Sequence, residues 1–395
     1  MISSFNFVKI PNILFGLNTL CQVFDMIPKY GRNILMVTGG SSLKDSGRLD
    51  EIVVNLEDRN INYAIASVKG EPSPTIVDSY ASEFKDNKLD LVIGIGGGSV
   101  IDAGKAISAM IPKQDSVKNY LEGVGTKVHD GEKVPYFAIP TTSGTGSEAT
   151  KNAVISEIGP NGFKKSLRHD NLVPDVAVID PDLIIDCPPS ITAACGMDAF
   201  TQLLEAYVST KANPITDALA LSGMKYMKEN MISVYSDGAA DLNVRAAMAY
   251  GALLSGITLA NAGLGIIHGL ASPVGGLFNI PHGVVCGTLL SEATKMNIQK
   301  LRETGHEGKI GLKKHADIGA LLVDEVCLEE SKINQYCSIL IDTLEEWSEE
   351  LNISRLGKFG INTDDLEKIV EMAGLKNNPV DLSKEDIKKI LECRI

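Results

Sequence analysis

The feature of this sequence that most constrains its fold is a change of pattern near residue 186. Before it, short apolar runs rich in β-forming residues alternate with helical patterns. The runs are 33–38, 62–68, 89–96, 136–140 and 176–180. Runs that are apolar without alternation are typical of strands covered on both faces. Strand and helix in turn therefore predict a doubly wound α/β domain with a mostly parallel sheet.

After the break the β signal is absent and long helical patterns follow. We expect helices over 191–208, 214–234, 240–262, 283–298 and 330–352. The Lys- and Gly-rich segment 299–315 is expected to be a solvated loop or a helix end. Two prolines within 186–190 end one element and begin the next. The 395 residues therefore predict two domains, a dinucleotide-binding α/β domain over 1–185 and an all-helical metal and substrate domain over 186–395.

Charge and cysteine usage narrow the class of protein. The net charge of −13 argues against nucleic acid or an anionic membrane as the main partner, because both require basic patches. No apolar run reaches the length of a membrane span, and the N-terminal 16 residues lack the charged start of a signal peptide. The seven scattered cysteines form no CxxC pair, which indicates reduced thiols. We expect a cytoplasmic protein without a nucleic-acid or membrane partner.

A glycine-rich segment, 94–105, follows a strand and opens a helix. Backbone N–H groups and the helix dipole can hold a phosphate there. Ser99 occupies the third glycine position of the dinucleotide fingerprint, so this segment alone fits a tight turn equally well. Two further loops, 38–42 and 141–148, follow strands and are rich in Gly, Ser and Thr. Such loops converge on one crevice in an open parallel sheet, which favours a phosphate-binding site.

The apolar helix 196–207 carries Asp198, Gln202 and Glu205 at i, i+4 and i+7, on one face. A buried carboxylate is costly without a partner. Of the six histidines, His268 and His282 lie in apolar, Gly-rich surroundings, and together with Asp198 they predict a metal site. The others are expected to be solvated surface residues: His129, His169, His306 and His315.

Six motifs in order resemble one known family. They are FVKIPNILFG (7–16), GGGSVIDAGK (96–105), IPTTSGTGSEAT (139–150), GMDAFTQLLEAY (196–207), the His-containing segment 261–283, and LKNNPVDLSKEDIKKIL (375–391). The chain resembles the iron-containing (group III) alcohol dehydrogenases, which have the dehydroquinate synthase-like fold. The resemblance covers nearly the whole chain.

The resemblance implies a nicotinamide dinucleotide in the α/β domain. The residues it places at this cofactor are Gly39, Gly40, Ser41, Gly97, Gly98, Ser99, Asp102, Thr141, Thr142 and Lys165. NAD-preferring sites usually place an acidic residue at the ribose 2′-hydroxyl, whereas the first strand here ends in TGGS, with Lys44 nearby. The sequence therefore favours NADP over NAD, and use of both remains open.

The resemblance also implies a divalent metal, Fe(II) or Zn(II), held by an Asp and three His. Asp198, His268 and His282 fill three of these positions and are the expected catalytic residues, whereas Gln202 stands in place of the remaining His. Either the Gln202 amide oxygen ligates the metal, or it only packs or binds a metal-bound water. Ser272 stands where many relatives have a His and cannot shuttle a proton near neutral pH.

The implied activity is hydride transfer between the nicotinamide and a small neutral alcohol or aldehyde, with the metal as Lewis acid. A cyclising lyase of the same fold needs a basic cluster, and the segment 268–283 contains no Lys or Arg. A metal-free reductase and a catalytically idle cofactor-binding scaffold remain as alternatives. The family resemblance also implies a homodimer or larger homo-oligomer.

Overall fold

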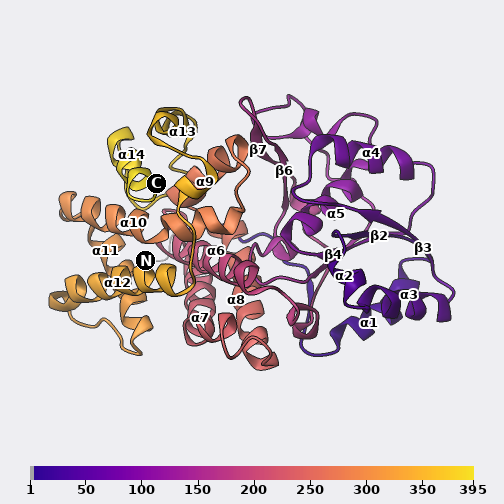
Figure 1. Cartoon of the computed structure of the whole chain (residues 1–395), viewed down its shortest axis with the longest axis horizontal. Coiled ribbons are helices and arrows are strands. Elements are labelled where there is room, and N and C mark those ends of the chain that lie inside the picture. Colours follow the sequence, from indigo (N-terminus) through magenta and orange to yellow (C-terminus); the bar gives the residue numbers. More distant parts are fainter. Residues whose placement is uncertain (1–3) are drawn as a thin grey trace.

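The computed structural model describes residues 4–395, in which a sheet-containing part and a helical part lie side by side (Figure 1). Residues 1–3 belong to the N-terminal segment for which the sequence predicts no signal peptide, and they lie outside the described residues. The main sheet is parallel throughout, in the order β1-β8-β5-β4-β2-β3. Its strands are β1 (Asn12–Phe15), β2 (Asn33–Thr38), β3 (Asn62–Ser67), β4 (Leu91–Gly96), β5 (Tyr136–Pro140) and β8 (Val176–Ile179).

Helices cover both faces of this sheet. They are α1 (Thr19–Met26), α2 (Ser42–Asp45), α3 (Arg48–Asp58), α4 (Pro74–Phe84) and α5 (Gly98–Met110). Alternate residues of β2 belong to different hydrophobic clusters. Leu35 packs with residues of α4 and α5, whereas Ile34 packs with residues of α1 and α3. The doubly wound α/β prediction is confirmed, because strands buried on both faces carry apolar residues at every position.

Two strands of the N-terminal part were not predicted as a pair. β6 (Asn152–Glu157) and β7 (Phe163–Arg168) form a separate antiparallel ribbon. The ribbon contacts α5 on one side and α9 (Ile266–Leu277) of the helical part on the other. It lies between the two parts in Figure 1.

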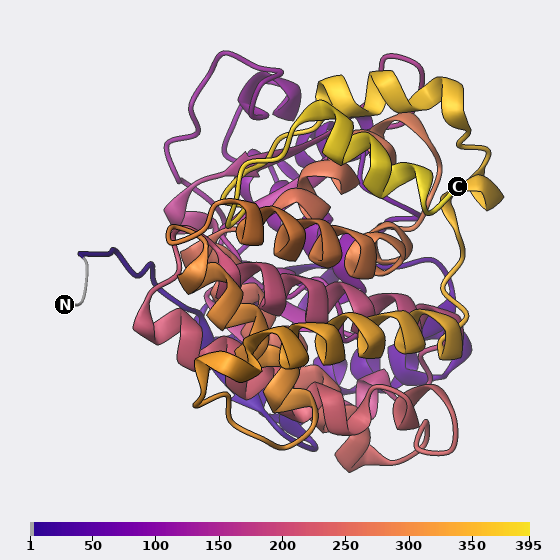
Figure 2. The ribbon, with the colours of Figure 1, turned by 90° about the vertical axis from the view of Figure 1, so that its left-hand side faces the viewer.

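The remaining helices form the C-terminal part (Figure 2). They are α6 (Pro189–Val208), α7 (Pro214–Asn230), α8 (Leu242–Ala262), α9 (Ile266–Leu277), α10 (His282–Glu303), α11 (Lys309–Leu322), α12 (Ile333–Glu350), α13 (Leu366–Met372) and α14 (Lys384–Glu392). α6 packs against α7, α8 and α10, and most of its residues are buried. Of the segment 299–315, expected to be a solvated loop or a helix end, the first residues are the end of α10, which runs to Glu303; the expectation is wrong from Lys309, where α11 begins. The division between residues 185 and 186 stays a prediction.

Two of the four histidines expected at the surface are buried, so that expectation is wrong for them. His129 is 2% exposed, and its Nε2 lies 3.1 Å from the Ala109 carbonyl oxygen. His315 is fully buried, and its Nδ1 lies 2.7 Å from the Gly311 carbonyl oxygen. One ring nitrogen of each His contacts a backbone carbonyl, which neighbouring charged residues in the sequence do not reveal.

Within residues 4–395, no single helix combines the length and hydropathy of a membrane span. α8 and α9 meet those criteria only when taken together, and they are bent by 101° at their junction.

Candidate active site

A cleft of about 1470 Å³ lies between the α/β part and the helical part. From the sheet side it is lined by Gly39, Gly97, Gly98, Ser99, Asp102, Thr141 and Thr142. From the helical side it is lined by Asp198, Gln202, His268 and His282. The loops that follow β2, β4 and β5 thus converge at one edge of the sheet, as parallel strands require.

Four side chains from three helices converge in the wall of this cleft. They are Asp198 of α6, His268 of α9, and His282 and Cys286 of α10. Their potential ligand atoms all lie within 4.8 Å of one another. His282 and Cys286 are four residues apart on one helix and so share its face. Cys286 was not among the candidates from sequence, although a His and a Cys at this spacing within a helix could have indicated it.

The carboxylate at the centre of this cluster lacks a satisfying partner. Asp198 is 2% exposed, and within the described chain its Oδ1 accepts no well-formed hydrogen bond. The Nε2 atoms of His268 and His282 lie 3.3 and 3.7 Å from it. Burial opposes ionisation of Asp198, but the two imidazoles outweigh it and lower its pKa to about 2. A buried, ionised oxygen among ring nitrogens suits a metal cation.

Glu205 fixes the orientation of His268. Its Oε2 lies 2.7 Å from His268 Nδ1, and its Oε1 accepts the Ile267 N–H at 2.7 Å. Nδ1 therefore donates its proton to Glu205, so that in the neutral ring, the form that a metal binds, Nε2 is the acceptor facing Asp198. The sequence placed Glu205 on the same helical face as Asp198 but gave it no role. A carboxylate behind a metal-binding imidazole is the usual support for such a ligand.

The Gln202 amide has a partner of its own. Its Oε1 accepts a hydrogen bond from Ser255 Oγ of α8 at 2.8 Å, and both residues are buried. Ser255 Oγ lies 3.5 Å from the Gly144 carbonyl oxygen of the loop after β5. Metal ligation by Gln202 stays a prediction.

The N-terminus of α5 suits a phosphate. Gly97 is its N-cap, and no side chain caps its free N–H groups. A side chain at residue 98 would meet Thr145, because a Cβ there would lie 2.5 Å from the Thr145 Oγ1. A Cβ at Gly97 would reach within 3.5 Å of Thr142. Because Gly97 and Gly98 have no side chains, the loop that carries Thr142 and Thr145 can pack closely against this turn. The backbone N–H groups of the turn remain free to bind a ligand.

Asp102 of α5 also carries an unsatisfied oxygen at the cleft. Its Oδ2 accepts the Val154 N–H at 3.1 Å, whereas Oδ1 is buried without a hydrogen bond from the described residues. Burial raises the pKa of Asp102. A polar atom of this kind at a cleft wall is available to a bound cofactor.

Three residues expected at the cofactor do not line the cleft: Gly40, Ser41 and Lys165. Ser42 and Leu43 line it on the first loop, and Lys164 and Ser166 line it on β7. Successive residues of a strand point to opposite faces, so Lys165 is turned away when Lys164 faces the cleft. The roles of these three residues stay predictions.

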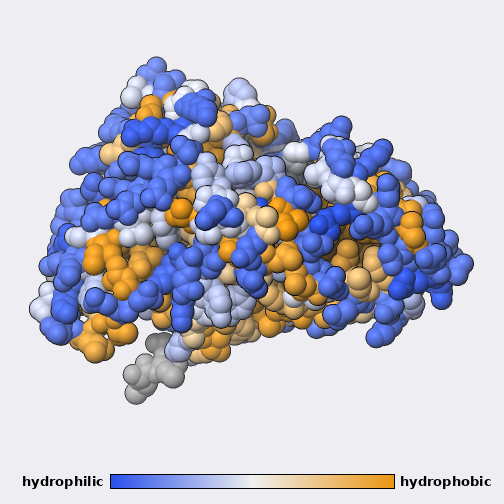
Figure 3. Space-filling view, turned by 60° about the horizontal axis from the view of Figure 1, so that its bottom comes forward, coloured by the Kyte–Doolittle hydropathy of each residue, from blue (hydrophilic) through white to orange (hydrophobic). Residues whose placement is uncertain are grey.

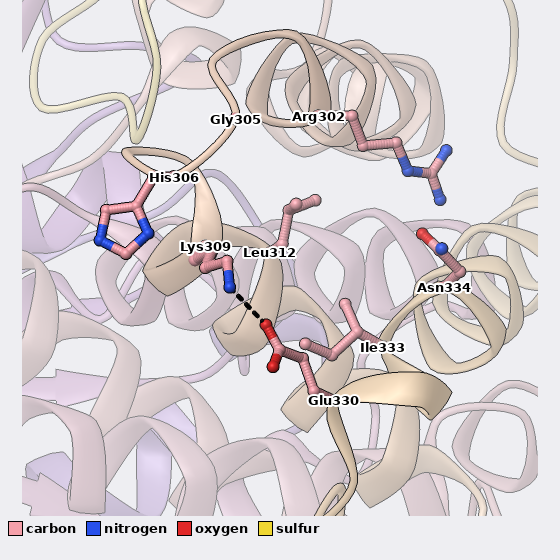
Figure 4. A pocket seen from close by; sticks show the side chains of 8 residues that line it. All are labelled: Arg302, Gly305, His306, Lys309, Leu312, Glu330, Ile333 and Asn334. Carbon is pink, nitrogen blue, oxygen red and sulfur yellow. Dashed lines mark hydrogen bonds and ion pairs between the residues drawn. The ribbon is translucent and has the colours of Figure 1, made fainter.

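A second, shallow hollow lies on the helical part, away from this cleft (Figure 4). It is formed by the end of α10, the start of α11 and residues 330–334, and Lys309 bonds to Glu330 across it at 2.7 Å. No residue singled out from sequence for catalysis, metal or cofactor binding lines it.

The chain matches two family profiles that together cover most of its length. Residues 11–181 match the profile of the iron-containing alcohol dehydrogenases, and residues 192–395 match that of the C-terminal part of the Fe-containing alcohol dehydrogenase family. The chain belongs to the iron-containing alcohol dehydrogenase family. The resemblance stated from the sequence motifs is therefore confirmed.

Relatives within this family match along their whole length. Alcohol dehydrogenase 4 of Saccharomyces cerevisiae is 35% identical over 392 residues, covering 97% of this chain and 96% of the relative. The NADPH-dependent butanol dehydrogenase of Clostridium saccharobutylicum is 30% identical, with 97% and 96% covered. A crystal structure of a 1,3-propanediol oxidoreductase superposes with a TM-score of 0.88 at 28% identity, covering all of both chains.

Membership of the iron-containing alcohol dehydrogenase family assigns the chain to the NAD(P)-dependent oxidoreductases that act on alcohols and bind a metal. The donor set in the cleft fits this assignment. A buried, ionised carboxylate and two imidazoles converge there, opposite an uncapped helix N-terminus that fits a dinucleotide.

Proposed function

We propose that this protein transfers hydride between NADP(H) and a small neutral alcohol or aldehyde, with Asp198, His268 and His282 as ligands of a divalent metal. The observation that supports this most directly is the meeting of Asp198 Oδ1 with two imidazole Nε2 atoms, 3.3 and 3.7 Å away, in the wall of the cleft. When bound, a divalent metal supplies the Lewis acidity that polarises the substrate oxygen.

The remaining residues bind the cofactor or orient a metal ligand. The pyrophosphate would lie over Gly97, Gly98 and Ser99, with Thr141 and Thr142 beside it. Gly39 and Asp102 also line the cleft, and the family resemblance adds Gly40, Ser41 and Lys165 to the proposed cofactor set. Glu205 holds His268 in the tautomer whose Nε2 is free. Ser272 lines the cleft but cannot titrate near neutral pH, so the substrate proton leaves through water or the ribose hydroxyls.

The preference for NADP rests on the loop after β2. This loop offers no carboxylate to a 2′-hydroxyl before Asp45. A Cβ at Gly40 would lie 3.9 Å from the Lys69 Cγ, so the Lys69 side chain starts beside this loop, which supports a cation within reach of a 2′-phosphate. The Clostridium saccharobutylicum relative described above is named as NADPH-dependent.

We expect Lys69→Ala to raise KM for NADPH several-fold and to leave KM for NADH nearly unchanged; equal effects on both would contradict a 2′-phosphate contact.

A neutral substrate fits the cleft near the two histidines. The segment 268–283 has no Lys or Arg, and Leu264 and Val284 line the cleft beside it. Lys164 and Lys376 also line the cleft; Lys164 is paired with Glu71, and burial lowers the pKa of Lys376, which lies near Glu205. The relatives named for butanol and 1,3-propanediol support substrates of this size.

The test of the proposed function is aldehyde reduction with NADPH and NADH after chelation, and again after anaerobic addition of Fe(II), Zn(II), Mn(II) or Co(II). Activity should vanish on chelation and return with a metal. Activity that survives complete metal removal would identify a metal-free reductase instead. Cofactor binding without turnover under every condition would identify an idle scaffold.

We also propose a homodimer or larger homo-oligomer in the cytoplasm. β1 is an edge strand, and Phe5, Ile10, Phe15 and Leu17 around it are exposed apolar residues. Figure 3 shows apolar patches on an otherwise mostly polar face, some of them next to the start of the described chain. Such an edge is suited to pairing with a second copy. All seven cysteines are free, which fits a reducing compartment. Light scattering during size-exclusion chromatography would measure the oligomer, and a monomeric mass would contradict it.

A further inference from the structure

We propose that the metal is bound through sulfur, with Cys286 as the fourth protein ligand in place of Gln202. The inference rests on the proposed metal role of Asp198, His268 and His282. It changes the chemical character of the site from oxygen and nitrogen donors to a mixed set with one thiolate.

Four of the six distances between ligand atoms in the cluster are close to those of a tetrahedral site, and all six are below 4.8 Å. Metal bonds of about 2.0–2.1 Å to nitrogen or oxygen and about 2.3 Å to sulfur give tetrahedral edges of about 3.3 Å between N and O and about 3.6 Å between N and S. Cys286 Sγ lies 3.6 Å from His268 Nε2 and 3.7 Å from His282 Nε2. The corresponding distances from Asp198 Oδ1 to these nitrogens are 3.3 and 3.7 Å. One ion can therefore contact all four atoms without a large movement of the helices.

A second observation points to a ligand at the same place. Asp198 Oδ1 is buried and, within residues 4–395, has no well-formed hydrogen bond, although both Nε2 atoms are near. Acceptors and ring nitrogens at this spacing are poorly placed to bond one another, but they are placed to share a cation.

Gln202 is less suited to be the fourth ligand. Its amide oxygen lies 2.8 Å from the Ser255 hydroxyl, which is equally close to the Ala252 carbonyl oxygen. It is also neutral and a weaker donor than a thiolate for Zn(II). Cys286 is fully buried and, unlike Asp198, His268 and His282, is not part of the described lining of the cleft. The sulfur therefore lies on the inner side of the cluster and leaves the cleft side open for a substrate oxygen.

Sulfur ligation has consequences for charge and metal choice. Two imidazoles, one carboxylate and one thiolate neutralise a dication, whereas a carboxylate with three neutral donors leaves one positive charge. Binding of the ion releases the thiol proton to solvent. A thiolate favours Zn(II) among the divalent ions that this family could use.

The test uses the full chain, stripped with a chelator and loaded with Co(II) or Zn(II). Co(II) should give a thiolate-to-cobalt charge-transfer band in the near ultraviolet, and X-ray absorption of the Zn(II) form should show one sulfur at about 2.3 Å. Cys286→Ser should abolish the band and weaken Zn(II) binding more than about 100-fold. Loss of a residue that only hydrogen-bonds to a metal ligand typically costs less than this. The matched control is Cys337→Ser, which removes a fully buried thiol from another core cluster.

The outcomes separate the two proposals. A bound metal with only nitrogen and oxygen neighbours in the unaltered protein overturns the thiolate ligand and leaves the proposed function standing. Failure of the chain to bind any of the metals overturns both. X-ray absorption of the unaltered protein decides even if Cys286→Ser does not fold.

Discussion

At the scale of single residues, the partner of a metal-binding imidazole is expected to matter almost as much as the ligand itself. Glu205→Gln keeps the size of the side chain but removes the charge that orients His268 through the 2.7 Å contact with Nδ1. We expect the metal affinity to fall about 10–100-fold while the helical content is unchanged. Competition with a chromophoric chelator measures the affinity and circular dichroism the fold. An unchanged affinity would show that packing alone holds the imidazole.

A second residue-scale effect concerns the pH dependence of stability. Burial is the main cause that raises the pKa of Glu148, to about 7. Between about pH 4.5 and pH 7 the folded protein therefore holds more protons on this residue than the unfolded chain does. Stability is lost as the pH rises through that window, and the loss is complete above it.

Replacement of Glu148 by Gln should remove that loss. The free energy of unfolding of Glu148→Gln relative to the unaltered protein should increase between pH 5 and pH 7.5, by at most about 3 kcal/mol. Urea unfolding at several pH values measures it, with the exposed Glu83→Gln as the control. A constant difference across this range would contradict a titration of Glu148 in the folded state.

The sequence predicted the site residues that stand out from their immediate neighbours in the chain. It was less informative about contacts between residues far apart in the sequence. Asp198, His268 and His282 could be selected because ionisable residues stand out in apolar segments, and they do meet in the structure. Cys286 carries one local signal, its spacing of four residues from His282, whereas its other neighbours in the cluster come from α6 and α9. Lys165 was assigned to the cofactor site by resemblance. Adjacent residues of a strand point to opposite faces, and it is Lys164 that lines the cleft.

At the scale of elements, one buried lysine organises the loop between η3 (Ser147–Ala149) and β6. Lys105 Nζ of α5 is fully buried and donates to the carbonyl oxygens of Ser147, Thr150 and Asn152 at 2.7, 2.9 and 2.8 Å. Lys105→Met preserves the length of the side chain but removes the ammonium that these three carbonyls share, leaving only weaker contacts of 3.3 Å from Thr150 to Ser147 and Asn152. We expect a loss of roughly 3–5 kcal/mol of stability.

Chemical denaturation measures this loss, and Lys113→Met serves as the control because Lys113 pairs with exposed Asp130 and Glu132 instead. A difference of less than about 1 kcal/mol between the two variants would show that Lys105 does not hold the loop.

The elements that the sequence missed are those that depend on tertiary contacts. The strands of the main sheet are confirmed because strands buried on both faces have continuous apolar runs. The ribbon of β6 and β7 has no such run, since Phe163–Arg168 contains two lysines and an arginine, and it is held between α5 and α9. α11 was obscured because its first residues are Lys- and Gly-rich, although its later turns pack into the core with α12.

At the scale of the whole molecule, the cleft depends on how closely the two parts approach. Gly146, in the loop after β5, has φ +61° and meets Gly256 of α8 backbone to backbone. A Cβ at Gly256 would lie 2.1 Å from the Gly146 carbonyl oxygen, so the loop and helix α8 could not both keep their positions. The same loop carries Thr141 and Thr142 at the proposed cofactor, and α8 carries Ser255, the partner of Gln202. A glycine pair thus sets the distance between cofactor loop and metal helix.

Gly256→Ala should therefore move the two halves of the site apart. Within α8 alone, alanine favours the helix by roughly 1 kcal/mol, so any loss of stability must come from the contact with the loop. We expect a lower melting temperature and weaker NADPH binding, with the metal still bound, because Asp198, His268, His282 and Cys286 all belong to the helical part. Gly374→Ala is the control, since a Cβ there meets nothing within 4 Å. Calorimetry with and without NADPH measures both effects. A Gly256→Ala protein that is more stable and binds NADPH normally would show that the two parts adjust freely and that the glycine pair does not set the cleft.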